Sequence, residues 1–180
     1  MNLYIMRHGT TVWNEKGITQ GCSNNRLSKT GISLTKDASE KYKDIEFNII
    51  YCSPLMRTVQ TANIMNKFHN VKVIKDKRLI EIDQGIFTGR SKNDLTEEEK
   101  NLKFTRAESC GMESYQSAYN RAKEFLDDIK NNCNEDNVLI ITHNCTATFL
   151  EDLLLEIDVD FENDNHLRSF KNAEIKQFKY

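Results

Sequence analysis

The stretch NVLIITHN, residues 137–144, decides the fold class of this chain. Its four consecutive aliphatic residues, 138–141, would be buried on both faces of a β-strand, which is typical of a central strand in a parallel sheet. A helix is expected to follow it through Leu154. A strand buried on both faces needs helices packed on both sides of its sheet, so the stretch predicts an open α/β sheet.

The rest of the chain alternates further strands with helices, as such a sheet requires. Apolar or alternating runs predict strands at 3–6, 47–53, 71–75 and 173–180, and helical spacing predicts helices at 29–43, 54–68 and 113–131. Ser53 should cap the second of these helices, with Pro54 at its first position. We expect a loop at 14–28, an extended segment at 78–89 and a charged excursion with a short helix at 91–109. No internal repeat or linker divides the chain, so a single domain over residues 1–180 is expected.

The composition is that of a globular protein and excludes several classes of function. The 180 residues include 38% apolar and 29% charged residues, and the formal net charge is −2. That charge argues against a general affinity for nucleic acid or acidic membranes, and no apolar run is long enough to span a bilayer. Five cysteines without a CxxC pair, and no signal-peptide pattern, favour reduced thiols and a cytoplasmic location. Nothing in the sequence indicates an oligomeric state.

Polar side chains stand where the expected strands end. In open α/β sheets, ligands bind beyond the carboxyl ends of the strands. The residues expected at that edge are Arg7 and His8 after the first strand, Ser53 and Arg57 after the second, Glu81 from the extended segment, and Thr142, His143 and Asn144 after the central strand. Two histidines, two arginines and a carboxylate would therefore converge from distant parts of the sequence.

Each of these residues also has a purely structural interpretation. A single histidine at a strand end is more often a hydrogen-bonded structural residue, Arg57 alone would be a solvated helix residue, and Glu81 alone a surface carboxylate. A metal site formed by the two histidines is a further alternative. However, the chain contains no HxH, HExxH or Cys/His cluster, so we expect no metal and no other cofactor. The joint arrival of these residues at one edge is the stronger signal.

The chemistry that this set of residues suits is phosphoryl transfer. Arginine forks match the oxygens of a phosphate monoester, and a neutral imidazole can attack phosphorus to form a covalent intermediate. A carboxyl group can protonate the departing alkoxide and then take a proton from water. We expect positive charge from Arg7, Arg57 and His143 to stabilise the transition state without a metal.

Eight short motifs together resemble the histidine phosphatase superfamily, also called phosphoglycerate mutase-like. In the family's order, they are RHGTTVWN (7–14), QG (20–21), LSKTG (27–31), SPLMRTVQTA (53–62), RLIEIDQGIFTG (78–89), GMES (111–114), LIITHN (139–144) and NAEIKQF (172–178). The resemblance implies a three-layer α/β/α sandwich with a mainly parallel six-stranded sheet. It also implies His8 as nucleophile, Glu81 as general acid and base, a phosphate clamp of Arg7, Arg57 and His143, and a substrate side lined by Asn14, Gln20 and Gly21.

The sequence departs from the family pattern at two places. Asn144 stands where the family usually has glycine, and we expect it to keep its backbone N–H near the substrate and to tolerate unusual backbone angles. After Glu81, the glycolytic mutases typically continue with Arg-His-Tyr, whereas this chain has Ile82, Asp83 and Gln84. That continuation is closer to the phosphatase branch and favours hydrolysis.

The expected function is therefore that of a cytoplasmic, metal-independent phosphatase acting on a small phosphorylated metabolite. Two alternatives stay open: a phosphoglycerate mutase, and a non-catalytic module that binds a phosphorylated protein or metabolite. Sugar phosphates, α-ribazole phosphate and phosphorylated amino acids are all compatible substrates. Specificity should lie in the 14–26 loop and the 90–112 excursion, whose basic residues would either meet an acidic substrate or be solvated: Arg26, Lys92, Lys100, Lys103 and Arg106.

Overall fold

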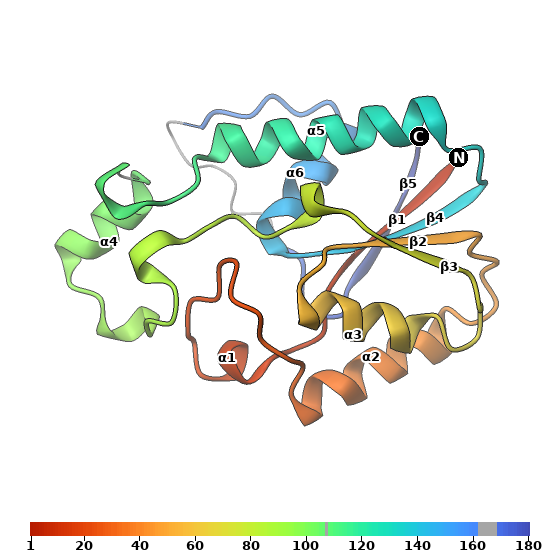
Figure 1. Cartoon of the computed structure of the whole chain (residues 1–180), viewed down its shortest axis with the longest axis horizontal. Helices are drawn as coiled ribbons and strands as arrows, with labels where there is room; N and C mark the ends of the chain where they lie inside the picture. Colours follow the sequence, from red (N-terminus) through yellow and green to blue (C-terminus); the bar gives the residue numbers. More distant parts are fainter. Residues whose placement is uncertain (107, 162–168) are drawn as a thin grey trace.

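The computed structural model describes residues 1–106, 108–161 and 169–180, which fold around a five-stranded sheet (Figure 1). The strands are β1 (Asn2–Arg7), β2 (Ile49–Cys52), β3 (Lys72–Lys75), β4 (Asn137–Thr142) and β5 (Ile175–Lys179), in the spatial order β3-β2-β4-β1-β5. The central strand β4 is parallel to β1 and β2, β3 is parallel to β2, and only β5 at one edge is antiparallel. The predicted α/β class and the central position of residues 137–142 are confirmed.

The sheet differs from the expectation in one respect, because the described residues form five strands rather than six. The segment 78–89, expected to be extended, instead contains two short 3₁₀ turns, Lys77–Leu79 and Gly85–Phe87. The Asp76 side chain accepts a hydrogen bond from the Arg78 N–H, and Gly85 adopts a φ of +49°. Both features bend the backbone where a strand would need extended residues.

Helices cover both faces of the sheet and complete the three layers that were predicted. In Figure 1, α2 (Lys29–Lys41) and α3 (Met56–Met65) lie below the sheet, and α5 (Tyr115–Asn132) and α6 (Asn144–Leu154) lie above it. Each predicted helix is present, with ends shifted by a few residues. The helix after β4 was expected to run through Leu154, and it does.

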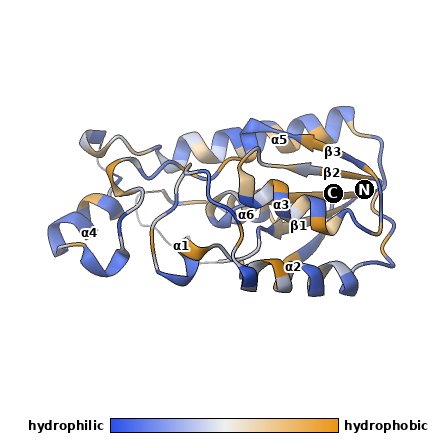
Figure 2. Ribbon diagram, turned by 60° about the horizontal axis from the view of Figure 1, so that its bottom comes forward, coloured by the Kyte–Doolittle hydropathy of each residue, from blue (hydrophilic) through white to orange (hydrophobic). Residues whose placement is uncertain are grey.

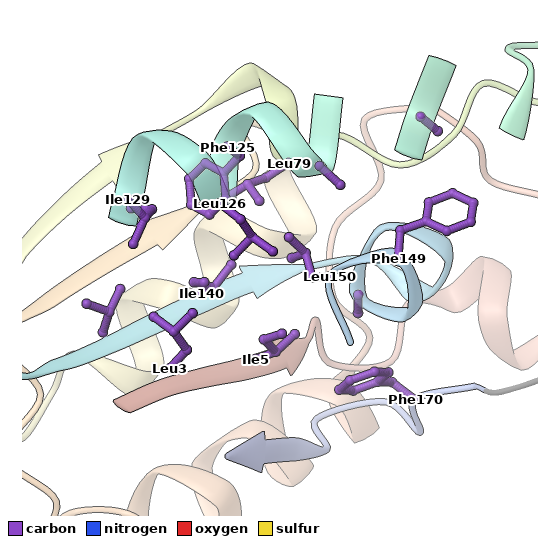
Figure 3. Packing of buried hydrophobic residues seen from close by; sticks show 14 of the residues in the cluster. Leu3, Ile5, Leu79, Phe125, Leu126, Ile129, Ile140, Phe149, Leu150 and Phe170 are labelled. Atoms are coloured by element: carbon purple, nitrogen blue, oxygen red, sulfur yellow. The ribbon is translucent and has the colours of Figure 1, made fainter. Parts of the chain in front are cut away.

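Alternate side chains of β1 fill the two halves of the core, because successive strand residues point to opposite faces. Leu3 and Ile5 pack with Phe125 of α5 and its neighbours in one cluster (Figure 3). Tyr4 and Met6 belong to the other cluster, with residues of α2 and α3. Burial of each such side chain stabilises the fold by roughly 1.5–3 kcal/mol. Packing on both faces therefore fixes the strand through Met6, and with it the positions of the next two residues, Arg7 and His8.

The helix α3 begins at Met56, two residues later than predicted, and the predicted cap Ser53 and first residue Pro54 both lie before it. Leu55 occupies the N-cap position and makes no side-chain cap. The Ser53 hydroxyl instead accepts from the Leu55 N–H at 3.3 Å and lies 2.8 Å from a histidine nitrogen, so it forms a turn rather than a cap. The first helical N–H, that of Met56, donates to Asn24 Oδ1 at 2.7 Å.

Two segments extend beyond the strand ends on the same side of the molecule (Figure 1). The first begins with the short helix α1 (Val12–Glu15), which enters the loop expected at 14–28 by two residues, because Thr11 and Asn14 form a reciprocal cap. The second contains α4 (Glu97–Phe104), the short helix expected in the excursion, flanked by one-turn 3₁₀ helices at Lys92–Asp94 and Glu108–Cys110. Figure 2 shows α4 as largely hydrophilic.

Candidate active site

Two histidines and an arginine meet at the carboxyl ends of the central strands, as predicted. The guanidinium Nε of Arg57 lies 3.2 Å from Nε2 of His8 and 3.1 Å from Nδ1 of His143. His8 directly follows β1, His143 directly follows β4, and Arg57 lies in the first turn of α3. The parallel register of β1 with β4 places the two histidines side by side, with ring centroids 5.2 Å apart.

The tautomer of His8 follows from its surroundings. Its Nδ1 lies 2.6 Å from the carbonyl oxygen of Gly9, and a carbonyl can only accept, so Nδ1 carries the proton. Nε2 is then left with its lone pair and faces the arginine. Gly9 is held close to α2: a Cβ added there would lie 2.4 Å from Thr35 Oγ1, so a larger residue would displace this carbonyl. The arrangement presents a nucleophilic nitrogen with a fixed direction.

Burial and positive neighbours keep this ring neutral. Desolvation lowers the pKa of His8 well below its ordinary value, and the charges of Arg57 and Arg7 lower it further. The bond to Gly9 opposes this shift but does not reverse it. His8 is therefore a free base at neutral pH, which nucleophilic attack requires.

Arg57 ties the two histidines to the loop after α1. One N–H of Nη1 donates to the carbonyl of Ser23 at 2.6 Å, and one of Nη2 donates to that of Gly21 at 2.8 Å. With Nε shared between the histidines, three of its five N–H groups have partners, and two remain for a ligand. Burial lowers the pKa of Arg57 to about 10, so the side chain keeps its charge at neutral pH.

Arg7 presents an unsatisfied donor to the site. Its Nη1 donates to the carbonyl of Phe170 at 2.6 Å and lies 3.4 Å from Asn144 Oδ1. Its Nε is buried and has no hydrogen-bond partner among the described residues. A buried guanidinium N–H without an acceptor is costly, and an anionic oxygen bound here would satisfy it. Desolvation lowers the pKa of Arg7, and the charge of Glu81 opposes that effect.

His143 differs from the expectation that it would add positive charge. Its Nδ1 accepts from Arg57, so Nε2 carries the proton and donates to Ser53 Oγ at 2.8 Å. Burial, Arg57 and His8 lower its pKa well below the ordinary value. The ring does not line the cavity. His143 is therefore a neutral group that orients Arg57.

The two neutral rings make stability depend on pH. In the unfolded chain, each histidine has a pKa near 6.5 and takes up a proton where the folded ring does not. Stability falls with decreasing pH wherever the unfolded state binds more protons. We expect the free energy of unfolding to drop below about pH 6.5, by up to about 1.4 kcal/mol per pH unit for each ring. Urea denaturation between about pH 5.5 and 7.5 measures this slope.

The variant His143→Gln serves as the comparison for that measurement. It removes one titrating group while keeping a polar side chain beside Arg57 and Ser53. The free energy of unfolding of this variant should change less steeply with pH than that of the wild type, by the contribution of one histidine ring. Identical slopes would show that His143 is not held neutral by the fold.

Glu81 reaches the site from the segment between the two 3₁₀ turns and lines the cavity. Its Oε1 accepts from the Ile82 N–H at 3.0 Å, which leaves the second oxygen for proton transfer. Two threonines fix the backbone before it: Thr142 Oγ1 donates to the Leu79 carbonyl at 2.7 Å, and Thr146 Oγ1 donates to that of Ile80 at 2.8 Å. The carboxylate is therefore anchored to β4 and α6.

The four predicted substrate-side residues all line the cavity: Asn14, Gln20, Gly21 and Asn144. The Thr11 N–H donates to Asn14 Oδ1 at 3.1 Å, and the Thr11 hydroxyl donates to Gln20 Oε1 at 2.9 Å, so Thr11 holds both amides. Asn144 begins α6 with a helical backbone, so no unusual backbone angle is needed there. Its Oδ1 accepts from the Phe170 N–H at 3.1 Å and holds Arg7.

The cavity has a volume of about 430 Å³, enough for a small metabolite. Several of its lining residues lie outside every motif quoted from the sequence: Ile18, Thr19, Tyr115, Cys145 and Ser169. Of the basic residues expected to set specificity, Lys92, Lys103 and Arg106 line it, whereas Arg26 and Lys100 do not. Among the described residues, no group of three or more histidine, cysteine, aspartate or glutamate side chains could hold a metal.

The chain is similar in sequence to several known proteins. The sequence profile of the histidine phosphatase superfamily (branch 1) matches residues 3–180. Phosphoserine phosphatase 1 of Hydrogenobacter thermophilus is 31% identical over 192 residues, covering 98% of this chain and 91% of the relative. A protein of Enterobacter named "Probable phosphoglycerate mutase GpmB" is 33% identical over 105 residues, covering 58% of this chain and 49% of the relative.

Solved structures share the fold at lower identity. The α-ribazole phosphatase of Shigella flexneri superposes with a TM-score of 0.82 at 22% identity, covering 98% of this chain and 89% of that one. A mycobacterial glucosyl-3-phosphoglycerate phosphatase superposes with a TM-score of 0.81 at 22% identity, covering 98% and 91%.

Proposed function

The chain belongs to the histidine phosphatase superfamily, and we propose that it hydrolyses a small phosphate monoester through a phosphohistidine at His8. The relatives named as phosphatases support a phosphoric monoester hydrolase. The observation that carries the proposed mechanism is the state of His8. Its proton is fixed on Nδ1 by Gly9, so the lone pair of the neutral Nε2 faces Arg57, which donates to it at 3.2 Å and would give up this contact to a bound phosphoryl group. A simple binding module needs no such nucleophile.

In the first step, Nε2 of His8 attacks phosphorus while the bond from phosphorus to the ester oxygen breaks. The leaving oxygen keeps the electron pair and takes a proton from the Glu81 carboxyl group. Arg7 and the free N–H groups of Arg57 bind the non-bridging oxygens. The Gly9 carbonyl accepts from Nδ1–H throughout and stabilises the positive charge that develops on the ring.

In the second step, Glu81 acts as a base, because it has given up its proton. It takes a proton from water, the water oxygen attacks phosphorus, and the bond between nitrogen and phosphorus breaks. The electron pair returns to Nε2, so His8 is neutral again and inorganic phosphate leaves. We expect no metal in either step, because Arg7 and Arg57 supply the positive charge.

Several expectations about the whole protein stay predictions. None of the five cysteines, all of which lie among the described residues, forms a disulfide, which supports the expected reducing, cytoplasmic location. Among the described residues, no helix is long and apolar enough to cross a membrane.

We also propose a single domain over residues 1–180, because β1 pairs with both β4 and β5. We propose that the protein binds no nucleic acid, because its formal net charge is −2.

The mutase alternative is tested by its product. Two of the three residues after Glu81 serve the fold: Ile82 is fully buried, and Asp83 Oδ1 accepts from the Gly85 N–H at 2.9 Å. Only Gln84 lines the cavity. Given 3-phosphoglycerate and a bisphosphoglycerate primer, we therefore expect the protein to release free phosphate faster than it interconverts the isomers. Phosphate release and ³¹P NMR of the two isomers measure both rates. Rapid isomerisation with little free phosphate would identify a mutase.

A further inference from the structure

Three basic side chains of the excursion line the same cavity as the nucleophile. They are Lys92 from the 3₁₀ turn before α4, Lys103 from the last turn of α4, and Arg106 just after it. The sequence left open whether these residues meet a substrate or are merely solvated. Lys103 and Arg106 are half-buried on the cavity wall, whereas Lys92 is exposed at its rim.

The charge around the cavity exceeds what one phosphate needs. Arg7 and Arg57 are the two cations nearest His8, and they match the two negative charges of a phosphate monoester. Glu81 is the only carboxylate among the described lining residues. The described cavity wall therefore carries five cations against one carboxylate, and the charge of Glu81 acts on Arg7 and Arg57.

The contacts of these cations do not neutralise them. Lys103 Nζ donates to Thr19 Oγ1 at 2.8 Å, an uncharged partner. Arg106 donates to the backbone carbonyls of Asp83 and Glu113, and its guanidinium lies 4.8 Å from the centre of the Tyr115 ring. Among the described residues, none of the three forms an ion pair with a carboxylate. Burial and the charges of Lys92 and Arg106 lower the pKa of Lys103 to about 8.

Other basic residues of the same excursion do have such partners. Lys100 Nζ lies 2.6 Å from a carboxylate oxygen of Glu97, and Arg90 forms a two-bonded pair with Glu99. Neither Lys100 nor Arg90 lines the cavity. The excursion therefore pairs Lys100 and Arg90 with carboxylates and leaves the three cations at the cavity without such a partner among the described residues, which is the arrangement expected of a binding site for an anion.

We propose that Lys92, Lys103 and Arg106 form a second anion subsite that binds a carboxylate or phosphate group of the substrate. This inference rests on the proposed function, because it assigns the class of substrate for the same site. The preferred substrates are phosphate monoesters with a second anionic group, rather than esters whose only charge is the transferred phosphoryl group. Arg106 and Lys103, held by Asp83, Glu113 and Thr19, provide fixed donors for that group.

Two pairs of matched substrates test the subsite. Glycerol 3-phosphate and 3-phosphoglycerate differ in a hydroxymethyl group and a carboxylate, while propane-1,3-diol monophosphate and its bisphosphate differ in a second phosphate. We expect kcat/KM to be about 10- to 100-fold higher for the doubly anionic member of at least one pair, the factor that a charge-assisted hydrogen bond provides. The pair that shows the preference identifies carboxylate or phosphate as the recognised group.

The variant Lys103→Met keeps a long apolar side chain and removes the charge that lies over the Phe87 ring. It should lower the preference ratio at least about 5-fold, since a charge-assisted contact is lost. Lys100→Met removes a charge from the same helix but outside the cavity, and it should leave the ratio unchanged. If Lys103→Met does not fold, Lys92→Met gives the same comparison at the cavity rim.

The outcomes separate the subsite from the proposed function. Turnover of all four esters and of nitrophenyl phosphate at similar kcat/KM would overturn the subsite and leave the phosphatase intact. A ratio that Lys100→Met lowers as much as Lys103→Met would also overturn it, because general surface charge would then be the cause. No turnover of any ester, and no phosphohistidine, would instead overturn the proposed function.

Discussion

Replacing His8 with asparagine should abolish the phosphoenzyme and lower kcat/KM by at least about 10⁴-fold, as loss of a covalent nucleophile does in other enzymes. Asparagine offers no lone pair comparable to the Nε2 that faces Arg57. Rapid quench with ³²P-labelled substrate measures the effect. The wild type should give an acid-labile, base-stable phosphoprotein, and the variant should give none.

The matched control for that experiment is His69→Asn. His69 packs against Phe47, with ring centroids 4.8 Å apart, and does not line the cavity. The same change of side chain there should leave labelling intact. A His8→Asn protein that labels or turns over like the wild type would falsify the assignment of the nucleophile.

Replacing Glu81 with glutamine should have an effect that depends on the leaving group. An alkoxide leaving group has a conjugate acid with a pKa of about 15 and needs a proton, so phosphorylation of His8 should slow by roughly 10²- to 10⁴-fold. A nitrophenolate can leave unprotonated, so the penalty on that step should be far smaller. Dephosphorylation should be slow with both esters, since water then lacks its base. Stopped-flow traces should show a burst of nitrophenol followed by a slow steady state.

Asp83→Asn is the comparison for the Glu81 variant. Asp83 is the other acidic residue of the segment, and its carboxylate accepts from the Gly85 N–H, an acceptor that asparagine can keep. It should show no dependence on the leaving group. Equal loss of the burst with alkyl and nitrophenyl esters in Glu81→Gln would mean that Glu81 is not the acid.

The parts of the fold that depend on apolar periodicity were predictable from the sequence. The aliphatic run at 138–141 could lie only between two helical layers, and the strand ends then fixed which polar residues would meet. The path of residues 78–89 was not predictable in this way. Its turns depend on an Asp76 side-chain contact and on the positive φ of Gly85, and neither leaves a periodic signal.

The site was predictable in its side chains but not in its backbone contacts. The place of Arg57 in the site could be predicted from its position at a helix start. The carbonyls of Gly21 and Ser23 that accept from it could not, because every residue has a backbone carbonyl and the sequence does not mark which ones will accept. The neutrality of His143 depends on a lone-pair direction that only the three-dimensional arrangement shows. Likewise, Lys100 and Lys103 lie on one polar helix, and charge alone cannot say which faces the cavity.

The pairing of β1 with β4 has a consequence for how the molecule acquires its shape. Asn2 and Asn137 are hydrogen-bonded neighbours although they are 135 residues apart. A contact between such distant residues requires closure of a long loop before any energy is gained, which slows folding. During synthesis, β2 and β3 can pair early, but β1 must wait for β4 to leave the ribosome. His8 and His143 therefore meet only late in biosynthesis, and a nascent chain that has not yet exposed β4 has no assembled catalytic centre.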